Sequence, residues 1–173
     1  MNYLEIEREM TKTYNAIATK YEKEAQEDWK DKKYVDNFLN YINKNDSILD
    51  IACGTGELLK YYNDKGFRTT GFDAISATFT LVHIPKEKIN EFIKKVSERL
   101  NEDGIFFTVF ITSLQEGIQE EPLDRNYKYY AVNYSTEEIS TLLIYNGFEI
   151  LENIEATRIN KSDVGIIVAR KLK

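Results

Sequence analysis

The chain has 173 residues, of which 42% are hydrophobic and 30% charged, so it can bury the core of one domain and is too apolar for a disordered protein. Its 23 basic and 29 acidic side chains give a net charge of −6, which argues against a nucleic-acid partner. One cysteine and one histidine exclude an internal disulfide and a zinc site built from the usual soft ligands.

Hydropathy excludes a membrane partner and a secretory signal. No apolar run approaches the roughly 20 residues that span a bilayer. Residues 1–5 lack the basic and then apolar layout of a signal peptide. We therefore expect a cytoplasmic protein that contains no metal site.

Residues 3–42 are predicted to be helical, because large apolar side chains recur at steps of three and four. Trp29 is expected near the join of two helices. We expect residues 1–44 to form cap helices on an α/β domain of residues 45–173. The same aromatic side chains permit a second interpretation, a protein-interaction surface around Trp29, Tyr34 and Tyr41.

A short apolar strand over residues 47–51 runs into a glycine turn and then a helix. Gly54 and Gly56 let the main chain turn sharply at the carboxyl end of a strand and let a ligand approach it. N–H groups at the start of the following helix face the same crevice. The order of strand, glycine turn and helix predicts a site for a nucleotide-like cofactor. Cys53 is expected to be a small packed residue rather than a nucleophile.

The rest of the chain alternates between strand and helix patterns. Residues 67–82 show the period-two alternation of a strand, with Phe79 and Leu81 between threonines. The later elements are a helix from Pro85, a buried strand over 105–111, a loop over 113–128, a helix from Ser135 to about Gly147, and a hairpin of strands 148–159 and 164–171. This alternation predicts a mostly parallel sheet with helices on its faces.

The glycine segment resembles a motif of the class I S-adenosylmethionine-dependent methyltransferases; it reads Ile48-Leu49-Asp50-Ile51-Ala52-Cys53-Gly54-Thr55-Gly56-Glu57. Four other stretches are similar to that family: Tyr14-Asn15-x-x-Ala18-x-x-Tyr21, residues 81–85, residues 100–106 and residues 147–150. The resemblance covers nearly the whole chain. It implies a Rossmann-like three-layer sandwich, S-adenosyl-L-methionine as cofactor and a small-molecule methyl acceptor.

The resemblance also implies roles for single residues. The cofactor would be held by Asp50, Ala52, Gly54, Thr55, Gly56, Asp73, Tyr14 and Tyr21. Asp50 would accept from the ammonium group, Asp73 would bind the ribose, and the two tyrosines would cover the pocket. Apart from the resemblance, His83, the single histidine, lies just after the carboxyl end of a strand, where it is expected to orient or deprotonate the acceptor. The acceptor pocket is expected to be lined by Tyr129, Tyr130, Asn133 and Tyr134. The alternatives are a turn-capping Asp50, a structural His83 and ordinary aromatic packing.

One feature departs from the family. Phe72-Asp73 matches both the end of the family's second strand and the opening of its fourth, which predicts an internal deletion between the two. A crossover between parallel strands needs about a dozen residues, so one chain cannot fill both positions. The merged segment then fills one position, or two chains exchange segments, or the helix after Gly56 repacks to reach the fourth position. We expect a reduced sheet stabilised by a homodimer, with a catalytically impaired relic as the alternative function.

Overall fold

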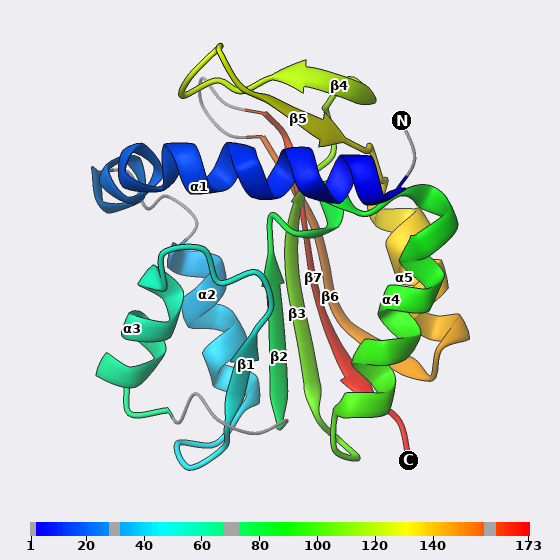
Figure 1. Ribbon diagram of the computed structural model, residues 1–173. Helices are drawn as coiled ribbons and strands as arrows, with labels where there is room; N and C mark the ends of the chain where they lie inside the picture. The colour runs from blue at the N-terminus through cyan, green and yellow to red at the C-terminus, as the bar shows by residue number, and fades with distance from the viewer. Residues whose placement is uncertain (1–2, 28–31, 68–72, 158–161) are drawn as a thin grey trace.

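A five-stranded sheet forms the middle layer of the computed structural model, which describes residues 3–27, 32–67, 73–157 and 162–173 (Figure 1). The strands are β1 (Ile48–Asp50), β2 (Ala74–Thr78), β3 (Ile105–Ile111), β6 (Phe148–Ala156) and β7 (Val164–Lys171), in the order β1-β2-β3-β7-β6. β2 pairs in parallel with β1 and β3, whereas β7 is antiparallel to both of its neighbours. Four of these five strands therefore point the same way, and the predicted mostly parallel sheet with a terminal antiparallel hairpin is confirmed.

Helices cover both faces of the sheet. One face carries α4 (Lys86–Arg99) and α5 (Thr136–Tyr145), and the other carries α2 (Lys32–Phe38), the 3-10 turn η1 (Leu39–Tyr41) and α3 (Glu57–Asp64). Alternate residues of β3 supply the two cores, because successive side chains of a strand point to opposite faces. Phe106 packs against α4 and α5, and Phe107 stacks on Phe38 at 4.7 Å between ring centroids. The three-layer sandwich follows from this two-sided burial.

The long helix α1 (Tyr3–Glu27) crosses the sheet at the edge where β1, β2 and β3 end (Figure 1). A hairpin of β4 (Gly117–Glu120) and β5 (Lys128–Ala131) lies against it, and the Thr13 hydroxyl donates to the Lys128 carbonyl oxygen at 2.6 Å. The expectation of a loop over residues 113–128 is therefore wrong. This hairpin forms a separate two-stranded sheet, and alternate side chains of its first strand, β4, are exposed in a largely polar sequence that hides the strand signal.

The merged segment occupies one position in the sheet. Residues 74–78 pair with β1 on one side and with β3 on the other, and α3 lies in the connection from β1. The predicted strand over residues 67–82 ends early, because Phe79 has a left-handed φ of 54° and the 3-10 turn η2 (Leu81–His83) follows. Residues 68–72 and Trp29 lie outside the described residues. The described sheet is thus reduced, with β1 at its edge.

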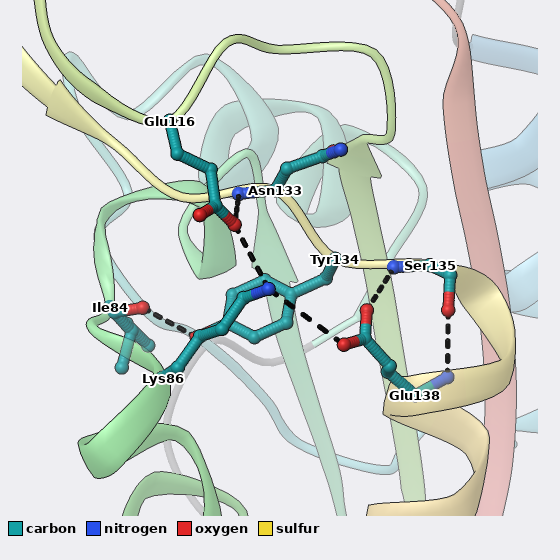
Figure 2. A network of polar contacts seen from close by, with 7 residues as sticks. All are labelled: Ile84, Lys86, Glu116, Asn133, Tyr134, Ser135 and Glu138. Atoms are coloured by element: carbon teal, nitrogen blue, oxygen red, sulfur yellow. Dashed lines mark hydrogen bonds and ion pairs between the residues drawn. The ribbon is translucent and has the colours of Figure 1, made fainter.

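The start of α5 is fixed by a reciprocal pair of hydrogen bonds, shown in Figure 2. The Glu138 amide donates to the Ser135 hydroxyl oxygen at 3.0 Å, and the Ser135 amide donates to the Glu138 carboxylate at 2.7 Å. This arrangement satisfies two helix-end amides and confirms the predicted start of the helix.

Ser135→Ala removes the side-chain acceptor and is expected to lower the free energy of unfolding by about 1 kcal/mol. Urea denaturation measures the change. Thr141→Ala, on an exposed position of the same helix, is the control and should leave stability equal or slightly higher. Equal stabilities of Ser135→Ala and the parent would contradict the capping role.

Candidate functional site

The loop between β1 and α3 presents bare main chain at the carboxyl edge of the sheet. Ala52, Gly54 and Gly56 have left-handed φ values of 56°, 55° and 86°. A Cβ placed on either glycine meets no atom within 4 Å, so open space faces both. Residues 52–55 are exposed. The expectation of a packed Cys53 is wrong, because the loop turns outward and carries this side chain into solvent.

Asp50 ends β1 directly before this loop and is almost fully buried, at 7% exposure. Its Oδ1 accepts a hydrogen bond from the Ser76 hydroxyl at 2.5 Å, whereas its Oδ2 accepts none from the described residues. Burial raises the pKa of Asp50 to about 6, and the Ser76 hydrogen bond opposes that rise. A buried carboxylate with one oxygen unpaired is costly, so a cationic partner at this point stabilises it.

Tyr62 on α3 belongs to the same buried polar group. Its hydroxyl is buried and makes no hydrogen bond within the described chain. Burial raises the pKa of Tyr62, and the charge of Asp50 raises it further. Sequence reasoning missed both Tyr62 and Ser76; a serine inside an otherwise apolar strand pattern is the signal that points to the latter.

Asp73 lies at the opposite end of the strands, where β1 and β2 begin. It precedes β2, and its carboxylate accepts from the Ser47 amide and hydroxyl at 3.1 and 2.7 Å and from Asn101 at 2.7 Å. In the parallel register Ile48 pairs with Ala74, so Asp73 stands where β1 begins and the glycine loop stands where β1 ends. This placement argues against the ribose role and gives Asp73 a structural one, joining three segments.

Tyr14 and His83 meet beneath α1, on the same edge as the glycine loop. The Tyr14 hydroxyl lies 2.8 Å from His83 Nε2, and His83 Nδ1 lies 2.9 Å from the Tyr130 carbonyl oxygen. Burial lowers the pKa of His83 and raises that of Tyr14. Just before His83, the Thr80 hydroxyl donates to the Ile51 carbonyl oxygen at 3.2 Å, which ties this turn to the glycine loop.

Two more tyrosines extend this aromatic group. The Tyr21 ring packs edge-on against Tyr14 at 6.2 Å, and the Tyr129 ring packs edge-on against His83 at 5.9 Å. Tyr21 is 38% exposed, so the group reaches the surface. The structure thus brings together Tyr14, Tyr21, His83 and Tyr129, from three elements far apart in sequence.

Tyr134 and Asn133 belong to a polar network with Ile84, Lys86, Glu116, Ser135 and Glu138 (Figure 2). The hydroxyl of the buried Tyr134 donates to the Ile84 carbonyl oxygen at 2.6 Å, and the main-chain amide of Asn133 donates to the Glu116 carboxylate at 3.3 Å. Figure 2 shows Lys86 between Glu116 and Glu138, with Nζ–O distances of 2.9 and 3.8 Å. These contacts join the segment after β3 to the starts of α4 and α5, which favours packing over acceptor binding for Tyr134.

The aromatic surface considered for a protein partner does not form around Tyr34 and Tyr41. Both side chains are half-buried, and Tyr41 donates to Glu152 on β6. Two surface clefts of about 460 and 470 Å³ lie elsewhere, lined respectively by residues of α2 and its neighbours and by residues of α4 and α5. Neither cleft is lined by residues of the glycine loop.

Within the described residues, no helix is long and apolar enough to cross a bilayer. The His, Cys, Asp and Glu side chains in the same part of the chain form no group of three suited to a metal ion.

Known proteins share sequence features and the fold of this chain. Residues 21–153 match the family model described as a methyltransferase domain. No curated protein sequence matches the chain. Among solved structures, it is similar to the DhpI-SAM-HEP complex, with a TM-score of 0.74 and 14% identity over 98% of this chain and 100% of that one.

Two other structures share the fold. The Burkholderia thailandensis 1,6-didemethyltoxoflavin-N1-methyltransferase, bound to 1,6-didemethyltoxoflavin and S-adenosylhomocysteine, has a TM-score of 0.72 and 12% identity over 100% of this chain and 92% of that one. A SAM-dependent methyltransferase from Methanosarcina mazei has a TM-score of 0.62 and 20% identity over 77% and 95%.

Proposed function

Because the chain belongs to the methyltransferase domain family, we propose that it binds S-adenosyl-L-methionine and transfers the methyl group to a small molecule. The observation that carries the proposal is the open glycine loop at the strand edge, next to a buried carboxylate oxygen without a partner. The 1,6-didemethyltoxoflavin bound in the Burkholderia enzyme supports a small-molecule acceptor.

The residues present fit the methionine half of the cofactor. Asp50 holds an unpaired oxygen for the ammonium group, which gives a charge-assisted hydrogen bond in a site of low dielectric. Ala52, Gly54 and Thr55 are exposed, open space faces Gly54 and Gly56, and α3 begins directly after this loop. Tyr14 and Tyr21 cover this edge from α1. When bound, the cofactor supplies an electrophilic methyl group on a sulfonium ion.

The protein's own part in catalysis is mainly to position the acceptor. Holding two reactants in line replaces an encounter in solution and lowers the barrier by several kcal/mol, up to about 7–11 in favourable cases. The helix α1 and the hairpin of β4 and β5 lie at the end of the sheet where β1, β2 and β3 end (Figure 1), a position from which they would limit the access of water to the reacting atoms.

Isothermal calorimetry with S-adenosyl-L-methionine and S-adenosylhomocysteine tests the proposal. We expect dissociation constants in the micromolar range, with a raised unfolding temperature in the presence of either ligand. Adenosine alone serves as the control for the methionine half and should bind much more weakly. No heat at millimolar S-adenosyl-L-methionine would refute the proposal.

We further propose a cytoplasmic homodimer. The single cysteine suits a reducing compartment. Since β1 ends the described sheet and pairs on one side alone, a second copy is the natural cover for its outer edge. Light scattering that gives a monomer mass would contradict the dimer. The relic and interaction-module alternatives are not supported by the family match or by the geometry.

A further inference from the structure

The hydrogen bonds of His83 fix where its proton lies. The Tyr130 carbonyl oxygen only accepts, so Nδ1 carries the ring proton and donates it at 2.9 Å. Nε2 therefore holds a lone pair, and the Tyr14 hydroxyl donates to it at 2.8 Å. Burial lowers the pKa of His83, which favours this uncharged ring.

Because the Tyr14 hydroxyl donates its proton to His83, Tyr14 can act only as a hydrogen-bond acceptor toward a ligand. A phenol has one O–H to donate, and here His83 accepts it. The remaining lone pair of the Tyr14 oxygen accepts hydrogen bonds. A small molecule that meets this hydroxyl must therefore supply an N–H or O–H group.

An acidic side chain acts on the pair. Burial is the largest cause of the raised pKa of Tyr14, and the negative charge of Glu121, from the segment between β4 and β5, raises it further. Glu121 is buried, at 6% exposure. Lys20, also on α1, is held by Asp124 at 2.5 Å. Such surroundings disfavour a carboxylate ligand and favour positive charge that develops on His83.

Resting on the proposed methyltransferase function, we propose that Tyr14 and His83 together accept the proton of an amine or hydroxyl acceptor. The new N–C or O–C bond forms as the bond from sulfur to the methyl group breaks, and the electron pair of the broken bond stays on sulfur. Tyr14 takes the acceptor's proton while its own proton passes to Nε2 of His83. The Tyr130 carbonyl stabilises the resulting imidazolium, which later returns the proton to solvent.

In this scheme Tyr14 touches the acceptor, and His83 acts through Tyr14 as a positioning and proton-accepting residue. Thr80, which bonds the glycine loop, keeps the pair on the cofactor's edge of the sheet. The acceptor class follows from the same geometry: small amines, phenols and alcohols, but not carboxylic acids.

The first test measures release of S-adenosylhomocysteine with benzylamine, aniline, phenol, benzyl alcohol and benzoate, each in the presence of S-adenosyl-L-methionine. We expect turnover of one or more N–H or O–H compounds and none of benzoate. Turnover of benzoate alone, or of none of them by a protein that binds the cofactor in calorimetry, overturns the inference. Absence of cofactor binding counts instead against the proposed function.

The second test uses variants with the best acceptor. Tyr14→Phe keeps the ring, and His83→Gln keeps both a donor for Tyr130 and an acceptor for Tyr14 but has no basic nitrogen. Each should lower kcat about 100-fold, and His83→Gln should also abolish the rise of kcat with pH and leave cofactor affinity unchanged. Tyr145→Phe, 80% exposed on α5, is the control and should match the parent. An unchanged kcat and pH profile in either variant overturns the inference.

Discussion

Asp50→Asn is expected to weaken S-adenosyl-L-methionine binding about 10- to 100-fold, because a hydrogen bond to a charged group contributes about 1.5–3 kcal/mol. The loss arises because Oδ2, the unpaired oxygen of Asp50, is the proposed acceptor for the ligand's ammonium group. Calorimetry at pH 7.5 measures it. Asp46→Asn, outside the site in the turn before β1, is the control and should bind like the parent.

The same substitution should act in the opposite direction on stability. Burial raises the pKa of Asp50 to about 6 in the folded protein, above the value of about 3.9 expected when unfolded. Between these values the folded state holds a proton that the unfolded state has lost, so stability falls as the pH rises through this window. Above pH 6, urea denaturation should give Asp50→Asn a free energy of unfolding about 1–3 kcal/mol higher than that of the parent. Below pH 4 the two proteins should be equally stable.

Cofactor affinity should also depend on pH through Asp50. The ligand's ammonium needs the ionised carboxylate, so affinity should fall as the pH drops below about 6. Asp50→Asn should lose this pH dependence. A variant that is less stable and binds as tightly as the parent would mean that Asp50 only caps the turn.

Gly56→Ala is expected to lower cofactor affinity at least tenfold, about 1.4 kcal/mol, with a modest loss of stability. Its left-handed φ of 86° adds about 1–2 kcal/mol of backbone strain for an alanine. The new Cβ meets no protein atom within 4 Å, so it projects into the space proposed for the ligand. Calorimetry and urea denaturation separate the two effects.

Gly147→Ala provides a matched control for this experiment. Gly147 follows α5 with a φ of 84° and also has no atom within 4 Å of an added Cβ. It should show the same backbone strain as Gly56→Ala but bind the cofactor like the parent. Equal cofactor affinities of Gly56→Ala and Gly147→Ala would show that the glycine loop does not contact the cofactor.

Local patterns predicted most elements because local chemistry determines them. Ser135 with Glu138 three residues later specifies a helix start, and the apolar run over residues 105–111 specifies a buried strand. The glycine loop was also predictable, since Gly54 and Gly56, which tolerate a positive φ, follow a short apolar strand. The strand β4 was missed because its sequence is largely polar and half of its side chains are exposed. The strand end at Thr78 was missed because alternation continues beyond it.

The candidate site divides in the same way. Asp50 and the glycines could be proposed from the sequence because they adjoin one another in it, and their role in cofactor binding stays a prediction. Ser76 and Tyr62 were missed because only the parallel register and the packing of α3 bring them to Asp50. Asp73 matched both the end of one family strand and the start of another, because the sequence does not reveal at which end of a strand a flanking carboxylate lies. The structure places it directly before β2.

By itself, the sequence determined the order of most helices and strands and the family-like motif, since periodicity and turn chemistry act over a few residues. Only the tertiary structure decided that residues 74–78 enter the sheet between β1 and β3 and that Tyr14 donates to His83, 69 positions away. Pairings of that kind depend on which distant surfaces bury one another, and strand alternation and helix periodicity are the same whichever partner is chosen.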